Sequence, residues 1–164
     1  MYPEPAPNPL PKRRIDDVEL YRDEVWQDFA LVPVLDVQAS AGHGSNVELE
    51  LKTGQLAFRK KWLREKSLNI EHLAIITAKG DSMEPTIRDG CILLIDRHID
   101  TIIDDAIYII QTDHHLIVKR VQQDLDGSLH IISDNKIYKE QLIPKEQAKE
   151  VKIAGRVIWF GHEI

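Results

Sequence analysis

The 164-residue sequence contains one cysteine, no long apolar run and no excess of basic charge. A single cysteine, Cys91, excludes a disulfide within the chain and is typical of a reducing cytoplasm. Because Cys91 lies in the apolar run CILLID, we expect a small core residue there and not a reactive thiol. No stretch of about 18 apolar residues occurs, so no membrane span is expected. Prolines occupy the N-terminal region where a signal peptide would be apolar, so we expect a cytoplasmic protein.

The charge balance and the spacing of metal-binding residue types exclude two further classes of function. The net charge is −6, which argues against a broad basic face that holds nucleic acid. Lys12-Arg13-Arg14 is a basic block, but three such charges are usually just solvated. Neither H-x-x-x-H nor C-x-x-C occurs, so we expect no metal site and no cofactor.

The first 30 residues differ from the rest of the chain in composition and in hydrophobic pattern. Proline stands at every second position from 3 to 11, which removes amide donors and favours an extended, solvated arm. The segment RIDDVELYRDEVWQDF that follows has apolar residues at spacings of three and four, which fits a short helix or an irregular packed segment. We therefore expect a linker or arm over residues 1–30 and a folded domain over 31–164. A helix-turn-helix needs a second helix and a supporting core, so we expect this chain not to read DNA by itself.

The domain predicted over residues 31–164 is mainly β. Short apolar runs alternate with turn residues, and the expected strands cover 31–39, 73–78, 91–97, 106–112, 116–122, 129–134 and 151–161. A short helix or turn is expected within 56–67, and an exposed glycine-bearing loop at 40–46. Strands of this length and spacing favour twisted, mainly antiparallel sheets.

Ser82 stands in the segment AKGDSMEPTIRDG, directly after a predicted strand. The nucleophile elbow G-x-S-x-G is matched in its first half only, because Glu84 replaces the second glycine. The tight turn with Pro85 can leave several backbone amides pointing one way, and such amides stabilise an oxyanion. The alternative is a serine that only caps the turn.

Lys119 is the candidate base for Ser82. In HHLIVKRVQQ, strand alternation puts Lys119 on one face between Ile117 and Val121. Burial there would lower the pKa of its ammonium group, and a neutral lysine can take a proton from serine. The alternative is a lysine on an edge strand whose charged end stays in water. A histidine is a rival base, but His114-His115 falls at a predicted hairpin tip, where exposure is expected.

These segments together resemble the LexA-type self-cleaving repressors, whose relatives include the lambda-type phage repressors and the polymerase accessory protein UmuD. The resemblance is carried by GDSMEPTIRDG with the downstream VKR, and by VPVLDVQASAG, DAIYII, SDNKIY and GRVIWFG. It covers the chain from Leu31 to Ile164 and implies the LexA/signal-peptidase-like fold. It also implies that Ser82 is the nucleophile and Lys119 the base.

The same resemblance implies the substrate, a bond in the protein's own loop. Ala41-Gly42 is the implied scissile pair, within a cleavage loop over residues 38–46. Small residues on both sides of this bond let an extended segment enter a narrow cleft, and Gly42 can adopt a sharp turn. The family's oxyanion donors are backbone amides near the serine. Asp81 and Met83 would then neighbour the site without side-chain chemistry.

The resemblance further implies a homodimer. It implies that activated RecA filaments trigger cleavage in the SOS response to DNA damage. It also implies that operator DNA is bound through an N-terminal helix-turn-helix domain, which we expect this chain to lack. Cleavage would separate the DNA-binding and dimerising halves and so relieve repression. Two alternatives remain. One is a UmuD-like accessory subunit of a translesion polymerase, and the other is a dimerisation module that no longer cleaves.

Overall fold

The computed structural model describes residues 26–36, 51–113 and 115–162, and the described residues form a mainly β fold, as predicted. The elements are, in chain order, β1 (Phe29–Asp36), β2 (Leu51–Arg59), α4 (Lys60–Glu65), the 3₁₀ helix η1 (Ile70–His72), β3 (Leu73–Thr77), β4 (Ile92–Asp96), β5 (Ala106–Gln111), β6 (Leu116–Gln123), β7 (Leu129–Ile132), β8 (Gln141–Ile143), α5 (Lys145–Ala148) and β9 (Lys152–Gly161). None of the described helices is long and apolar enough to cross a membrane.

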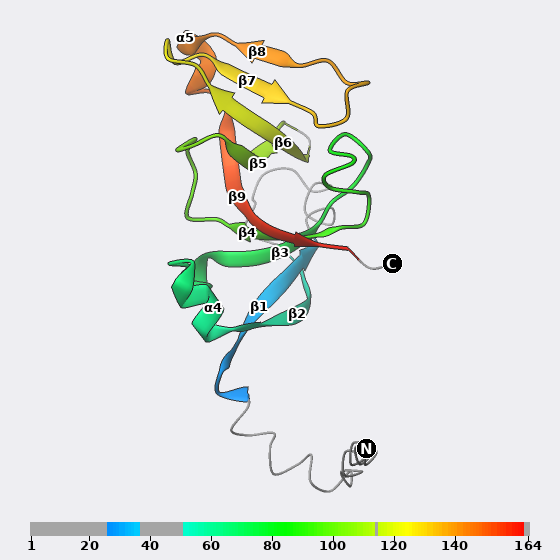
Figure 1. The fold of residues 1–164 in the computed structure, drawn as a ribbon, viewed down its shortest axis with the longest axis vertical. Helices are drawn as coiled ribbons and strands as arrows, with labels where there is room; N and C mark the ends of the chain where they lie inside the picture. Colours follow the sequence, from blue (N-terminus) through cyan, green and yellow to red (C-terminus); the bar gives the residue numbers. More distant parts are fainter. Residues whose placement is uncertain (1–25, 37–50, 114, 163–164) are drawn as a thin grey trace, which may run out of the picture.

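The nine strands of the described residues belong to one mixed sheet with the order β2-β1-β3-β4-β9-β5-β6-β7-β8. Only the pairing of β1 with β3 is parallel, and the other neighbours are antiparallel. Figure 1 shows β1, β2 and α4 at one end of the molecule and β7, β8 and α5 at the other. The long strand β9 joins the two halves, because it pairs with β4 on one side and with β5 on the other.

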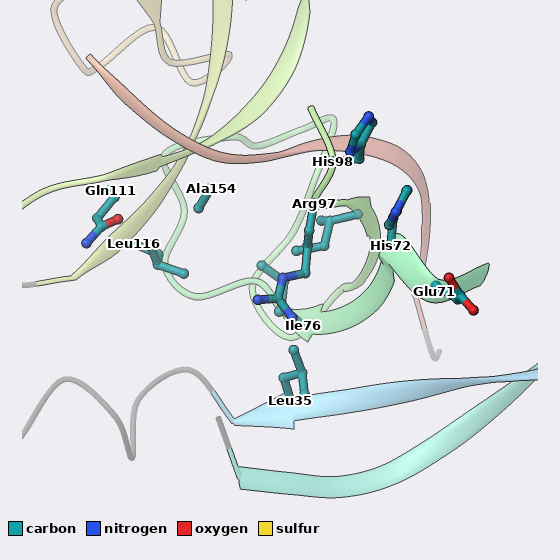
Figure 2. A pocket seen from close by; sticks show the side chains of 10 residues that line it. Leu35, Glu71, His72, Ile76, Arg97, His98, Gln111, Leu116 and Ala154 are labelled. Atoms are coloured by element: carbon teal, nitrogen blue, oxygen red, sulfur yellow. The ribbon is translucent and has the colours of Figure 1, made fainter. Parts of the chain in front are cut away.

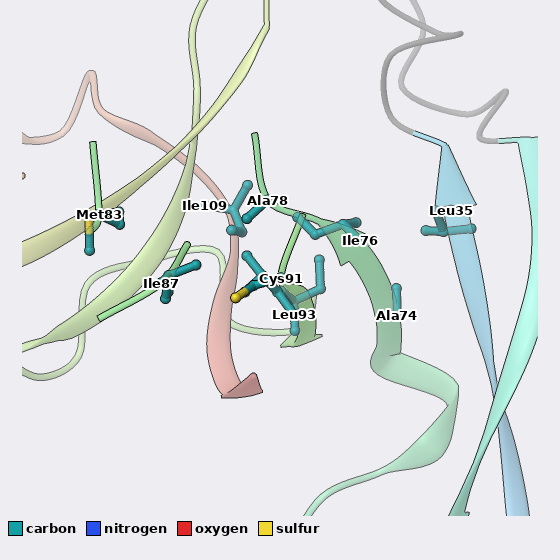
Figure 3. Packing of buried hydrophobic residues seen from close by; sticks show 10 residues of the cluster. Leu35, Ala74, Ile76, Ala78, Met83, Ile87, Cys91, Leu93 and Ile109 are labelled. Carbon is teal, nitrogen blue, oxygen red and sulfur yellow. The ribbon is translucent and has the colours of Figure 1, made fainter. Parts of the chain in front are cut away.

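The core consists of three apolar clusters that pack against different parts of this sheet. The central cluster takes residues from both halves, namely Leu35, Ala74, Ile76, Ala78, Met83, Ile87, Cys91, Leu93, Ile95 and Ile109 (Figure 3). A second cluster covers the opposite face of β3 and β4, and a third lies against β5, β6 and β7. Strands β3 and β4 are therefore buried on both faces, which explains why LAII and ILLI are continuous apolar runs. Cys91 is 2% exposed, as expected for a core residue.

Strand β1 contributes side chains to the clusters on both faces of the sheet. The register between β1 and β2 shifts between Val34 and Leu35. Ala30 and Val32 pack in the cluster beyond β3 and β4, whereas Leu35 packs in the central cluster. Successive residues of a strand point to opposite faces, so Leu35 lies on the face opposite to Ala30 and Val32, and the register shift leaves its extra residue, Thr53, in β2.

Several elements differ from the sequence-based expectation. Residues 56–59 are the end of β2 and not part of a helix, because β2 pairs along its whole length with β1 and α4 begins only at Lys60. The short edge strand β8 and the helix α5 were not predicted. The proline arm, most of the segment expected as a helix over 14–29, and the cleavage loop 38–46 lie outside the described residues.

Candidate active site

Ser82 lies in the turn that connects β3 to β4. The base of the turn is closed by two backbone hydrogen bonds, from the Ala78 amide to the Cys91 carbonyl at 2.8 Å and from the Gly90 amide to the Ala78 carbonyl at 3.0 Å. Gly80 and Gly90 have φ values of 81° and 80°, in the left-handed region that side chains disfavour. The Gly80 amide also donates to Asp89 Oδ1 at 2.7 Å, which fixes the chain just before the serine.

Two apolar side chains anchor this turn to the central cluster. Met83 is 3% exposed and Ile87 is 1% exposed. Two backbone hydrogen bonds stabilise this part of the turn. The Glu84 amide donates to the Asp81 carbonyl at 3.0 Å, and the Ile87 amide donates to the Met83 carbonyl at 2.9 Å. The residue after the serine is thus held in the core, and Ser82 is left half-buried at the surface.

Lys119 reaches the serine from β6, in the other half of the sheet. Its Nζ atom lies 2.7 Å from Ser82 Oγ. Lys119 pairs with Tyr108 of β5, and its same-face neighbours Ile117 and Val121 pack in the third cluster, as the alternation predicted. Burial lowers the pKa of Lys119, and the nearby Asp81 carboxylate opposes this effect by raising it. A lysine in contact with a hydroxyl and with a lowered pKa is suited to accept that hydroxyl's proton.

A pocket of about 480 Å³ opens beside this pair. Its walls include Ser82, Lys119, Ile76 and Leu116. The last two residues also line a second pocket of about 460 Å³, which extends past Leu35 at the end of β1 (Figure 2). The two pockets therefore adjoin, and together they connect the end of β1 with the Ser82 hydroxyl.

The segment 133–138 holds the serine turn from the other side, and sequence reasoning assigned it no role at the site. The Asn135 amide donates to the Ser82 carbonyl at 3.1 Å, and Asn135 Nδ2 donates to the Asp81 carbonyl at 3.1 Å. The Tyr138 hydroxyl donates to the Asp81 carboxylate, and its ring centroid lies 5.7 Å from Lys119 Nζ. The motif SDNKIY was noted in the sequence, but no periodic pattern connects it to a turn more than 50 residues upstream.

An ion pair joins the lysine strand to the same segment. Arg120 Nε and Nη2 donate to the two carboxylate oxygens of Asp134, each at 2.8 Å. This pairing lowers the pKa of Asp134, and a hydrogen bond from Thr86 in the serine turn lowers it further. Asp134 therefore contacts both β6 and the turn, and it fixes Lys119 and Ser82 relative to each other.

The other candidates are distributed as follows. Asp81 and Met83 flank the serine, as their sequence positions require, but Ala41 and Gly42 lie outside the described residues. Of the possible histidine bases, His115 lines the pocket beside Ser82, whereas His72 and His98 stack on each other in the neighbouring pocket. No group of three or more metal-binding side chains lies together among the described residues.

Comparison with known proteins gives consistent matches. Residues 33–158 match the family described as Peptidase S24-like. The chain is 34% identical over 130 residues to an uncharacterised HTH-type transcriptional regulator of Haemophilus influenzae, covering 78% of this chain and 54% of that protein. It is 32% identical over 135 residues to the 26 kDa repressor protein of Escherichia phage HK022, covering 80% and 57%. It is 29% identical over 137 residues to the repressor protein CI of Enterobacteria phage phi80, covering 82% and 57%. The chain thus spans little more than half the length of these relatives.

Proposed function

This chain belongs to the Peptidase S24-like family, and on that premise we propose that it is the C-terminal regulatory domain of a repressor that cuts its own chain with Ser82 and Lys119. The observation that carries the proposal is the 2.7 Å contact between Lys119 Nζ and Ser82 Oγ. It joins a residue with a lowered pKa to a hydroxyl at the wall of a pocket.

The proposed reaction follows the logic of a serine nucleophile with a lysine base. Neutral Lys119 takes the proton of Ser82, and Oγ attacks the carbonyl carbon of Ala41. The bond between Ala41 and Gly42 then breaks, and the Lys119 ammonium group returns the proton to the leaving amine. Water hydrolyses the resulting ester in a second step. We assign the oxyanion to backbone amides of the turn, chiefly that of Met83 directly after the nucleophile.

The pocket geometry supports a substrate that comes from the chain itself. The two adjoining pockets extend from Leu35, at the end of β1, to Ser82. The segment that contains Ala41 and Gly42 leaves β1 directly after Asp36, so only a few residues separate the strand from the scissile bond. An intramolecular substrate gains from this proximity, because its effective concentration at the nucleophile is high.

We extend the proposal to the whole regulator. Residues 1–30 act as a linker, residues 31–164 form the self-cleaving domain that dimerises, and operator DNA is bound by a separate N-terminal domain. Activated RecA filaments act as the trigger after DNA damage, and the protein works in the cytoplasm. The relatives named above are repressors or HTH-type regulators, and the matched region covers only 54–57% of each of them, which favours a repressor over a polymerase accessory subunit.

The test is the intact mass of the purified chain after incubation at pH 7, at pH 10, and at pH 7 with activated RecA filaments. We expect two fragments that end at Ala41 and begin at Gly42, formed faster at pH 10 because more Lys119 is neutral there. Ser82→Ala and Lys119→Ala should stay intact with unchanged thermal unfolding, and His115→Asn should still be cut. A wild-type chain that stays intact under all three conditions, or a rate that is flat between pH 6 and pH 10, contradicts the proposal.

A further inference from the structure

Asp81, Tyr138 and Lys119 form a compact arrangement on the exposed side of Ser82. The Asp81 carboxylate accepts a hydrogen bond from the Tyr138 hydroxyl. The Lys119 ammonium lies 5.7 Å from the centroid of the Tyr138 ring, on which a cation is electrostatically favoured. The Tyr138 side chain is 43% exposed, so water reaches this arrangement. Two residues therefore act on the charge of Lys119 from the side opposite to the core.

Asp81 is the carboxylate that can act on Lys119 most directly. Three further carboxylates lie in or against the serine turn: Asp134, whose charge is balanced by its two hydrogen bonds from Arg120, Asp89, which accepts from the Gly80 amide, and Glu84. The remaining polar or ionisable groups that face Lys119 are Ser82 and Lys79 from the turn, His115 at the start of β6, Tyr108 across the strand pair on β5, and Tyr138. The hydroxyl of Tyr108 is engaged by Asp104 and is thereby directed away from Lys119.

We propose that Asp81 and Tyr138 together set the pH at which the serine–lysine pair becomes active, with the Asp81 carboxylate favouring the protonated form of Lys119 and the Tyr138 hydroxyl weakening that effect. The proposal rests on the proposed function of Ser82 and Lys119. It gives the Asp81 side chain a role that the resemblance to self-cleaving repressors did not imply. Neither residue touches the reacting atoms, so both act through Lys119 and are positioning residues.

The Asp81 carboxylate and the Tyr138 hydroxyl act in opposite directions on the pKa of Lys119. The Tyr138 ring favours the ammonium form, but it is kept in Tyr138→Phe. A carboxylate near an ammonium group stabilises its charged form, and Asp81 accordingly raises the pKa of Lys119 against the effect of burial. The Tyr138 hydroxyl donates a hydrogen bond to the Asp81 carboxylate. This bond spreads the negative charge of the carboxylate toward the tyrosine and so weakens its attraction for the Lys119 ammonium group. Loss of the Asp81 charge should therefore let Lys119 deprotonate at lower pH. Loss of the Tyr138 hydroxyl should shift its deprotonation to higher pH.

The experiment follows the titration of Lys119 directly and the cleavage rate in parallel. Lysine labelled with ¹³C at Cε is incorporated into the Ser82→Ala chain, which stays uncut, and the Lys119 signal is assigned with Lys119→Met. We expect Asp81→Asn to shift the titration midpoint to lower pH and Tyr138→Phe to shift it to higher pH. In the double variant Tyr138→Phe should add nothing to Asp81→Asn, because the hydroxyl acts only through the carboxylate and phenylalanine keeps the ring beside Lys119. Glu84→Gln, in the same turn, is the matched control and should leave the midpoint unchanged.

With Ser82 present, the cleavage rate at pH 7 should rise several-fold in Asp81→Asn and fall several-fold in Tyr138→Phe. The difference between wild type and Asp81→Asn should shrink at about 1 M salt, because an exposed charge is screened there. A purely structural role would slow cleavage equally at every pH and leave the Lys119 midpoint in place.

An unchanged midpoint in Asp81→Asn, or shifts of the same sign in both variants, overturns the inference. The titration is read without cleavage, so the two proposals can fail separately. Opposite midpoint shifts in a chain that never cuts itself would support the electrostatic role and contradict the proposed function alone.

Discussion

Ser82 and Lys119 meet at 2.7 Å, yet they are held by two different kinds of structure. Lys119 lies in the middle of β6, which pairs with β5 on one side and with β7 on the other. Ser82 lies in an irregular turn that is anchored by buried side chains and by hydrogen bonds from the distant Asn135. The position of the lysine thus follows from regular strand register, whereas that of the serine depends on a set of individual contacts.

This difference makes the serine turn the more vulnerable of the two supports. A strand in the interior of a sheet shares its position among many backbone hydrogen bonds, so one weakened side chain moves it little. A turn with few backbone hydrogen bonds depends on each of its anchors. Substitutions that remove contacts of equal size should therefore affect the turn more than β6.

The largest effect is expected for Ile87→Ala, which removes the most buried anchor of the turn. Ile87 is 1% exposed in the central cluster, and truncation of a buried isoleucine costs about 2–5 kcal/mol. Ile109→Ala is the matched change in β5, the interior strand that pairs with β6, because Ile109 is 0% exposed in the same cluster. Urea denaturation in the Ser82→Ala background measures both, and we expect the larger loss in Ile87→Ala. Equal losses would show that the turn is no more dependent on its anchor than the strand.

The same contrast explains which elements could be predicted from the sequence. Strands β3, β4, β5, β6, β7 and β9 were expected close to their observed bounds, because each is an apolar run between turn residues. Strand β2 is an edge strand with a glycine at its centre and exposed residues at most positions, so its apolar alternation is weak. Strand β8 has three residues and α5 has four, too few for any periodic pattern to emerge.

The site shows the same division between local pattern and distant contact. Ser82 and Lys119 are the candidate pair that the sequence predicts, and they lie 2.7 Å apart, while strand alternation correctly predicted the apolar neighbours of Lys119. It could not identify Asn135 and Tyr138 as partners of the serine turn, because these polar side chains sit in a loop without periodicity. Their contacts depend on the sheet order, which brings the segment after β7 beside the turn after β3.

A smaller effect is expected for Asp134→Asn, which weakens the ion pair between the lysine strand and the segment 133–138. The side chain of Asp134 is 12% exposed and that of Arg120 is 35% exposed, so we expect a loss of about 1–2 kcal/mol at pH 7. Because the pKa of Asp134 is lowered in the folded protein, its stabilisation is complete above the pKa of an unfolded aspartate. It is lost as the pH falls through the lowered folded value.

Urea midpoints of wild type and Asp134→Asn, both in the Ser82→Ala background, test this pH dependence. The difference between the two chains should be constant from pH 7 down to about pH 5 and should then close in acid. Arg120→Gln should reproduce it, because it removes the same pair from the other side. A difference that persists unchanged to about pH 2 would mean that the aspartate acts by packing and not by its charge.

The smallest effect on stability is expected for Asn135→Ala. This variant distinguishes the positioning of Ser82 from the control of the protonation of Lys119. The backbone amide of residue 135 still donates to the Ser82 carbonyl, but the bond from Nδ2 to the Asp81 carbonyl and the bond from the Ile137 amide to Oδ1 are lost. Both bonds are exposed, and each contributes about 0.5 kcal/mol, the low end of the usual range. The turn becomes looser while the charges around Lys119 stay in place, so cleavage should slow several-fold at every pH without a shift in the pH profile. Lys139→Ala, an exposed neighbour, should change neither property. A shifted profile in Asn135→Ala would mean that the backbone of the turn, and not only the carboxylate of Asp81, controls the proton on Lys119.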